Sequence, residues 1–304
     1  MFKKILFPFF LFNFFIVFAQ MKEEYSFALQ SEYLKQLKKY PFIKKIGVQN
    51  NPLIKMEDNL VYKNLPNRKL HLDAFIHKSK ENLPAVLLVH GGGWKSGSKE
   101  MQNALAEKIA TEGYQTFTIE YRLSEEAKYP AAIDDVHDVI NFIKKNAKEF
   151  KIDAAKIAIL GCSSGGQMAS LIGAKYPAEV NAVIDIDGIL AFHHPDSQEG
   201  KMAALWLGGT YEEIPEVWND ASALAHVSDK TPPFLFINSQ FKRFSAGQSD
   251  FIKKLNGFGI YSKVERIENS PHTFWLFDPW FQPTTKYIVN FLNFTFKKDQ
   301  NENL

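Results

Sequence analysis

From Lys69 onward, short apolar runs alternate with amphipathic segments along the chain. Runs typical of buried strands occupy residues 70–77, 85–90, 115–122, 156–161, 182–187, 234–238 and 261–268. Apolar positions at helical spacing occupy residues 99–113, 131–150, 167–176, 246–259 and 284–298. Strands that alternate with helices predict a mostly parallel sheet with helices on both faces. Ligands of such sheets bind beyond the carboxyl ends of the strands.

After residue 19, the sequence predicts an extension, one domain with an insertion inside it, and a short tail. Residues 69–298 are expected to form one α/β domain, because no Pro/Ser/Gly-rich linker or internal repeat divides them. Within it, residues 188–233 are too long for a plain connection and form an insertion after the sixth strand. This insertion is either a cap over the site or a surface excursion that serves stability alone. Residues 20–68 are polar and predict an extension with a helix over 31–39 and an irregular strand, and residues 299–304 form a tail.

The first nineteen residues have the pattern of a secretory signal peptide. Lys3 and Lys4 precede an apolar stretch, and Val17-Phe18-Ala19 resembles a cleavage site, so we expect a secreted or periplasmic protein cut after Ala19. The apolar core is shorter than the roughly 20 residues that cross a bilayer. No stable membrane span is therefore expected after cleavage.

Charge and cysteine content exclude several classes of function. Removal of the two leader lysines takes the formal net charge from +2 to about zero, so a nucleic-acid partner is not expected. Cys162 is the only cysteine, which excludes an internal disulfide framework and a cysteine-based metal cluster. Adjacent histidines on a loop rarely converge on one ion, so His193 and His194 do not predict a metal site.

The turn Gly161-Cys162-Ser163-Ser164-Gly165 joins a predicted strand to a predicted helix. Glycines two residues either side of Ser163 permit a sharp, strained turn that exposes its hydroxyl above the sheet. The start of the helix adds partial positive charge close to a developing oxyanion. The spacing predicts Ser163 as a nucleophile, with Cys162 and a turn without chemistry as alternatives.

Three consecutive glycines, residues 91–93, follow the predicted strand 85–90. Their N–H groups have no side chains in the way and suit a developing negative charge. A phosphate-binding loop would need a Lys-Ser/Thr pair or the Rossmann glycine spacing, and neither is present. The glycines therefore predict an oxyanion hole, with a plain turn as the alternative.

His272 lies in a predicted loop close to the end of the chain, after the strand over 261–268. A histidine at such a place can supply the general base for Ser163.

Taken together, the segments 90–94, 119–136, 156–171 and 231–238 resemble α/β-hydrolases of the carboxylesterase and acetylesterase type, in order and spacing. The resemblance covers about residues 69–298 and implies the α/β-hydrolase fold. The closing stretch 270–284 is similar to that of secreted bacterial esterases associated with polysaccharide breakdown.

The resemblance also implies roles for individual residues. Ser163 corresponds to the nucleophile and His272 to the base, while the N–H groups of Gly92, Gly93 and Ser164 correspond to the oxyanion hole. Serine esterases of this type use no cofactor.

The expected acid is missing from its usual place. Relatives carry it shortly after the strand that corresponds to 234–238, but residues 238–243 here read Asn-Ser-Gln-Phe-Lys-Arg. Asp187 is the best substitute, because some lipases of this fold place their acid at the end of the preceding strand. Asp185 would face the same side but lie deeper, since side chains alternate along a strand.

Two other carboxylates compete with Asp187 for this role. Glu268 and Asp278 lie close to His272 in the sequence. A Ser–His pair without an acid is the remaining alternative.

Several side chains are candidates for substrate binding. Trp94, Phe274 and Trp275 are expected to line the pocket and to leave room for only a short acyl group, although aromatic residues more often lie in a core. Arg243 stands where relatives have their acid, and it either faces an acidic sugar or forms an ion pair on the surface.

The sequence thus predicts a secreted serine esterase that acts through an acyl-enzyme. Its expected substrates are short-chain esters, with acetyl as the leading acyl group, on a polysaccharide such as pectin or xylan, or other small esters. One alternative is a peptidase of the same fold, which is disfavoured because no propeller or other domain precedes the catalytic unit. The other is a non-catalytic binding protein that retains the fold.

Overall fold

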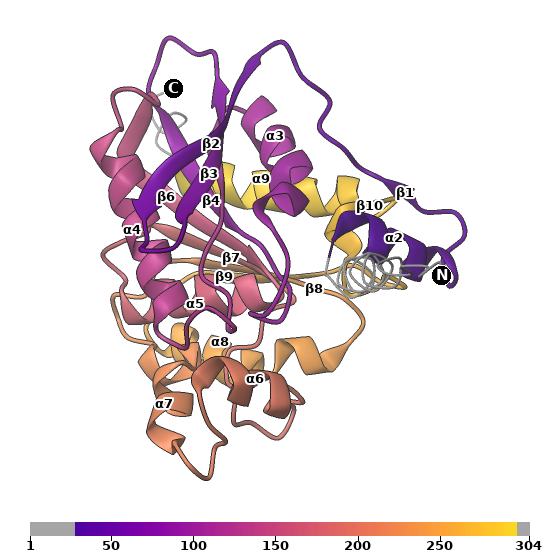
Figure 1. Cartoon of the computed structure of the whole chain (residues 1–304), viewed down its shortest axis with the longest axis vertical. Coiled ribbons are helices and arrows are strands. Elements are labelled where there is room, and N and C mark those ends of the chain that lie inside the picture. Colours follow the sequence, from indigo (N-terminus) through magenta and orange to yellow (C-terminus); the bar gives the residue numbers. More distant parts are fainter. Residues whose placement is uncertain (1–27, 297–304) are drawn as a thin grey trace, which may run out of the picture.

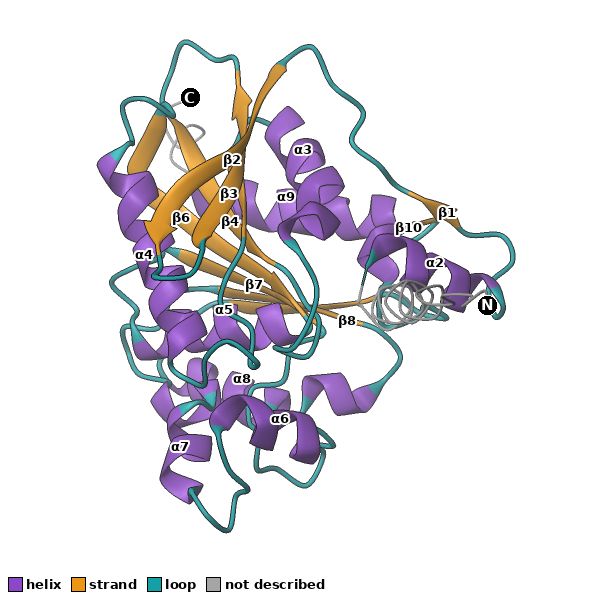
Figure 2. Ribbon diagram, viewed as in Figure 1, coloured by secondary structure: helices purple, strands orange, loops and turns teal. Residues whose placement is uncertain are grey.

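A twisted sheet lies between two layers of helices in the computed structural model, which describes residues 28–296 (Figures 1 and 2). The sheet has the strand order β2-β3-β5-β4-β6-β7-β8-β9. The first three of these strands are antiparallel neighbours, and all later pairs are parallel. The strands are β2 (Ile54–Asn64), β3 (Lys69–His77), β4 (Leu83–Val89), β5 (Gln115–Ile119), β6 (Ile152–Cys162), β7 (Ala182–Ile186), β8 (Phe234–Asn238) and β9 (Ser262–Arg266). This is the mostly parallel sheet that the alternation of patterns predicts.

The inner strands are continuous apolar runs because helices cover both of their faces. Every residue of β5, β7 and β8 is buried. On one face lie α4 (Ala131–Lys145), α5 (Ser164–Lys175) and α8 (Gln248–Gly257). On the other lie α3 (Asn103–Thr111), which follows the short helix η1 (Lys99–Gln102), and α9 (Phe281–Phe296). Two separate apolar cores result, one on each face of the sheet.

The segment before residue 69 is part of this architecture. β2 pairs with β3 along most of its length, so the expected domain boundary at residue 69 falls inside a hairpin and is wrong. β2 is an edge strand with most of its side chains exposed or half-buried, which explains its polar sequence. Further upstream, α2 (Leu29–Leu37) leads to β1 (Lys44–Lys45), which pairs with β10 (Phe277–Asp278) near the end of the chain.

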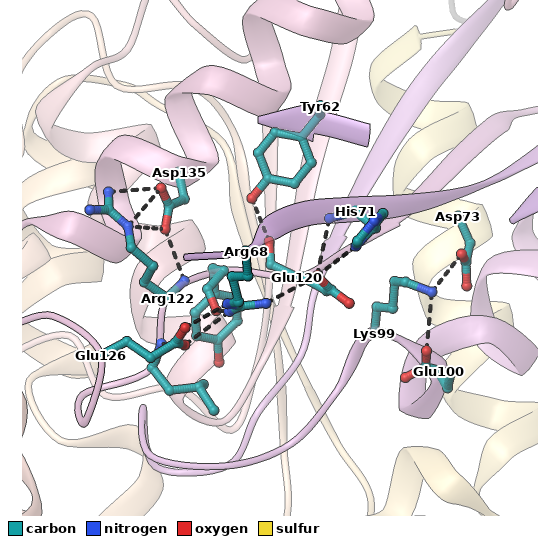
Figure 3. A network of polar contacts seen from close by, with 12 residues as sticks. Tyr62, Arg68, His71, Asp73, Lys99, Glu100, Glu120, Arg122, Glu126 and Asp135 are labelled. Atoms are coloured by element: carbon teal, nitrogen blue, oxygen red, sulfur yellow. Dashed lines mark hydrogen bonds and ion pairs between the residues drawn. The ribbon is translucent and has the colours of Figure 1, made fainter. Parts of the chain in front are cut away.

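A network of polar contacts fixes the β2–β3 hairpin to the loop after β5 (Figure 3). The buried Asp135 carboxylate accepts hydrogen bonds from the Arg122 guanidinium at 2.8–3.1 Å and from Lys63 of β2 at 2.6 Å. Arg68 pairs with Glu126 in the same loop. This loop in turn holds the chain next to the site, because the N–H of Ser124 donates to the carbonyl of Trp94 at 2.8 Å.

The insertion lies where it is expected, between β7, the sixth strand of the sheet, and β8. It contains α6 (Gly200–Leu207), α7 (Pro215–Asp220) and the short helix η2 (Ala223–His226). Trp206 and Trp218 anchor it in the core on the α5 side.

Within residues 28–296, no helix is long and apolar enough to cross a membrane. The expected signal peptide over residues 1–19 and the expected tail over 299–304 lie outside the described residues.

Candidate active site

Ser163 lies in the strained turn that its flanking glycines predict. β6 ends at Cys162, α5 begins at Ser164, and Ser163 between them has φ 56° and ψ −121°. Such a conformation costs a non-glycine residue about 1–3 kcal/mol, so the surrounding structure must hold it. A Cβ on Gly161 would stand 1.9 Å from the carbonyl oxygen of Gly165, so the turn closes only because Gly161 has no side chain.

Ser163, His272 and Asp187 form a hydrogen-bonded series. Nε2 of His272 lies 2.8 Å from Oγ of Ser163, and Nδ1 lies 2.8 Å from Oδ2 of Asp187. An ionised carboxylate only accepts hydrogen bonds, so Nδ1 is the donor to Asp187 and Nε2 is left to accept from the serine hydroxyl. The Asp187 side chain is almost fully buried, whereas that of His272 is partly open to the cleft.

Asp187 follows directly after β7 and is held by the loop that follows β8. Its Oδ1 accepts a hydrogen bond from the N–H of Ser239 at 2.7 Å. The loop where relatives carry their acid therefore holds the carboxylate in this chain instead of supplying it. Asp187 itself has φ 52°, an uncommon backbone conformation for a residue other than glycine.

The competing carboxylates lie elsewhere. Glu268 is exposed and pairs with Arg266 at 3.8 Å, and Asp278 lies in β10, where its backbone is paired with that of Lys44 in β1. Among residues 28–296, Asp187 is the carboxylate hydrogen-bonded to His272.

Asp185 lies two residues before Asp187 and deeper in the sheet, as the alternation of side chains along a strand predicts. Its carboxyl group accepts hydrogen bonds from Ser170 Oγ and from the N–H of Gly188, both at 2.7 Å. Burial raises its pKa from 3.8 to about 8, against the opposing effect of these two donors. Asp185 thus braces the turn below Asp187 and does not reach the histidine.

The glycine loop lies against the serine turn. A Cβ on Gly91 would stand 2.7 Å from the carbonyl oxygen of Cys162 and 3.0 Å from Cβ of Ser163. Gly92 and Gly93 have positive φ values of 132° and 61° and line the same cleft as Ser163. Their N–H groups donate no hydrogen bond to any other residue within 28–296, which leaves them available to an oxyanion.

Ser164, the third expected donor, is the first residue of α5, where the helix dipole places partial positive charge. His90, before the glycines, stacks on Tyr121 with ring centroids 4.3 Å apart. Burial lowers the pKa of His90 to about 4, so this ring is neutral and serves the structure of the loop.

Cys162 is not placed to act as the nucleophile. Its thiol is fully buried in the core on the α3 and α9 side and lies 3.6 Å from Oε1 of Gln102. Burial also raises the pKa of the thiol well above its usual range, which disfavours the reactive thiolate.

Above Ser163 opens a cleft of about 510 Å³. Ser163, His272 and the glycine loop line it, and so do Glu32, Lys35 and Gln36 of α2 together with Lys39, which follows the helix. Oε1 of the buried Glu32 accepts a hydrogen bond at 2.9 Å from Thr273, the residue after His272. The sequence analysis missed this contribution of α2, because nothing in a short polar segment indicates which loop it contacts.

Two side chains of the loop after β8, Phe244 and Arg243, form a stack with His272. Phe244 lies parallel to the imidazole, with ring centroids 3.4 Å apart and planes inclined by 12°. The guanidinium of Arg243 lies 4.2 Å from the centre of the Phe244 ring on the cleft side. Arg243 also forms an ion pair with Glu199 of the insertion at 3.8 Å.

Two of the three aromatic residues expected to line the pocket do not. Phe274 and Trp275 are buried in the core between the sheet and α9, where their apolar rings are shielded from solvent. Trp94 is also buried, stacked on Trp206 and bonded through Nε1 to Gln167 at 2.9 Å. Trp94 does, however, form part of a small side pocket next to Ser163.

This side pocket encloses about 20 Å³. It is lined by Trp94, by Ile189 from the insertion and by Phe244, together with Ser163 and Ser164. Such a space holds no more than a very small group.

The adjacent histidines of the insertion face different partners. His193 stacks on Tyr211 with centroids 3.6 Å apart, and Nε2 of His194 lies 3.4 Å from Asp250. The described part of the chain contains no group of three or more His, Cys, Asp or Glu side chains arranged to hold a metal ion.

Comparisons with known proteins agree with this architecture. The model of the BD-FAE family matches residues 72–244, more than half of the chain. Esterase LipC of Mycobacterium tuberculosis is 30% identical over 188 residues, which are 55% of this chain and 47% of LipC. The chain thus spans about half the length of this relative.

Solved structures share the fold at low sequence identity. A truncated carbohydrate esterase from gut microbiota superimposes with a TM-score of 0.70 at 20% identity, covering 81% of this chain and 99% of that one. The acetyl ester-xyloside bifunctional hydrolase of Caldicellulosiruptor lactoaceticus gives 0.67 at 19% identity, covering 80% and 98%. The chain therefore belongs to the BD-FAE family and has the α/β-hydrolase fold.

Proposed function

We propose that the protein is a serine esterase in which Ser163 is the nucleophile, His272 the general base and Asp187 the acid. The observation that carries this proposal is the series of two 2.8 Å hydrogen bonds from Ser163 through His272 to Asp187. The free N–H groups of the glycine loop beside Ser163 support it, as do relatives named as esterases.

The reaction follows from the positions of these groups. His272 takes the hydroxyl proton through Nε2 while Ser163 Oγ attacks the ester carbonyl, and the N–H groups of Gly92, Gly93 and Ser164 stabilise the oxyanion. Collapse of the tetrahedral intermediate breaks the bond to the alcohol, which leaves with the proton from His272. A water activated by His272 then attacks the acyl-enzyme, and the carboxylic acid is released as Ser163 recovers its proton.

We further propose that the substrate carries a small acyl group on a large alcohol, with acetylated carbohydrate as the best candidate. The side pocket of about 20 Å³ fits an acetyl methyl, and the cleft of about 510 Å³ has room for a sugar. Carbohydrate esterases among the similar structures support this class. The signal-peptide pattern before residue 20 supports export from the cytoplasm, which would bring the enzyme to extracellular polysaccharides.

Labelling with a fluorophosphonate probe tests the nucleophile. The probe should modify Ser163, and Ser163→Ala should lose both the label and nearly all hydrolysis of p-nitrophenyl acetate. Cys162→Ala serves as the matched control and should keep both. A label mapped to Ser164 or Cys162 would overturn the assignment.

A series of acyl chains tests the size of the side pocket. We expect kcat/KM to fall from p-nitrophenyl acetate to butyrate to octanoate, because longer chains do not fit beside Trp94 and Ile189. Ile189→Ala should raise the ratio of butyrate to acetate turnover by roughly tenfold, since one methylene in an apolar pocket changes discrimination by about 1–3 kcal/mol. A wild-type preference for octanoate would point to a lipase instead.

A further inference from the structure

Glu199 is a carboxylate next to Ser163 to which the proposed mechanism gives no role. It lies in the insertion directly before α6 and lines both the open cleft and the side pocket. Ser163 also lines both cavities, so Glu199 stands close to the point where the acyl and alcohol portions of an ester meet.

One oxygen of this carboxylate lacks a hydrogen-bond donor. The side chain is only 17% exposed, and its Oε1 is buried without a hydrogen bond from any residue within 28–296. Nη1 of Arg243 pairs with the same oxygen at 3.8 Å, which is beyond hydrogen-bond distance. Buried polar atoms are nearly always satisfied, so an unsatisfied one beside a nucleophile indicates that a donor arrives with the ligand.

Arg243 attracts the Glu199 carboxylate as an ion pair but donates no hydrogen bond to it. The guanidinium lies on the face of Phe244, which itself stacks on His272. Glu199, Arg243 and Phe244 thus form a row from the insertion to the histidine, and Oε1 of Glu199 remains able to accept a hydrogen bond from the substrate.

We propose that Glu199 accepts a hydrogen bond from a free hydroxyl group on the carbon next to the ester, and so selects esters of polyols and sugars that are only partly acylated. This inference rests on the proposed esterase function. With the acyl methyl in the side pocket, the alcohol lies in the cleft that Glu199 borders, and a neighbouring hydroxyl is the donor that a sugar offers there. A site built to bind a hydroxyl discriminates strongly against an analogue that lacks it, because its polar group is then left unpaired.

Two cyclohexyl esters isolate the contribution of the hydroxyl. The substrates are trans-2-hydroxycyclohexyl acetate, resolved into its two enantiomers, and cyclohexyl acetate, which differs only in lacking the hydroxyl. For the wild type we expect kcat/KM to favour one hydroxylated enantiomer by about 10- to 100-fold, as for hydrogen bonds to charged groups. Glu199→Ala should bring that ratio close to one, and Glu199→Gln, which keeps one acceptor oxygen, should give an intermediate ratio.

Glu216→Gln is the matched control, because Glu216 is an exposed acid of the same insertion outside the cleft, and it should keep the wild-type ratio. A wild-type ratio near one for both enantiomers, or a ratio unchanged in Glu199→Ala, would overturn the role of Glu199. If the wild-type protein hydrolyses neither p-nitrophenyl acetate nor cyclohexyl acetate, the proposed esterase function itself is overturned.

Discussion

Asp187 combines an unusual backbone conformation with a precise set of partners. Its backbone has φ 52° at the end of β7, and its side chain reaches His272. One carboxylate oxygen, Oδ2, bonds the imidazole, and the other, Oδ1, accepts a hydrogen bond from the N–H of Ser239. Burial of a carboxylate is costly unless hydrogen bonds satisfy its oxygens. The acid can therefore arise from β7 because the loop after β8 still supplies one of the contacts that hold it.

The neighbouring Asp185 predicts a specific dependence of stability on pH. Its pKa is 3.8 in its ordinary state and about 8 in the folded protein because of burial. Between these values the unfolded chain releases a proton that the folded protein keeps, so the contribution of Asp185 to stability falls as pH rises from about 4 to about 8.

Asp185→Asn removes this titration. The free energy of unfolding of the variant relative to wild type should therefore rise with pH in this window, by about 1.4 kcal/mol per unit. Urea unfolding of both proteins at pH 5 and pH 7 measures the change. An identical difference at the two pH values would show that Asp185 is ionised in the folded protein.

At the scale of elements, the loop after β8 supports His272 with an aromatic face instead of an acid. Phe244→Leu keeps an apolar side chain but removes the flat ring that lies 3.4 Å from the imidazole. We expect kcat on p-nitrophenyl acetate to fall on the order of tenfold with little change in KM, because a misplacement of about 1 Å can cost up to 10²-fold.

Phe244→Tyr retains the ring and should keep kcat near the wild-type value. Thermal unfolding of both variants separates this effect from a general loss of stability. If the leucine variant is as fast as the tyrosine variant, the stack contributes packing alone.

The elements themselves were largely predictable, and the exceptions have physical reasons. The inner strands are buried on both faces, so their apolar runs are visible in the sequence, as in β7 and β8. β2 is an edge strand with exposed side chains, and its polar pattern gave no sign that it belongs to the sheet. α2 was expected as a helix near residues 31–39, but its place on the cleft wall depends on contacts with Thr273, far away in sequence.

For the molecule as a whole, the site residues that depend on local geometry were predictable and those that depend on long-range packing were not. The turn at Ser163 and the glycine loop are formed by residues that are neighbours in the sequence, so the spacing of their glycines indicates them directly. Phe274 and Trp275 were assigned to the pocket because they adjoin His272, yet they point into the core. Glu199 and Phe244 reach the site only through the folding of the insertion and of the loop after β8.

The central claim is that Ser163, His272 and Asp187 act as one unit with the acid supplied from the end of β7. Comparing kcat/KM of Asp187→Asn with those of Glu268→Gln and Asp278→Asn on p-nitrophenyl acetate tests it most directly. We expect Asp187→Asn to lose about 10⁴-fold, as removal of the acid from a serine protease does, while the other two variants stay near wild type. Full activity of Asp187→Asn, or a comparable loss in Glu268→Gln or Asp278→Asn, would contradict the account.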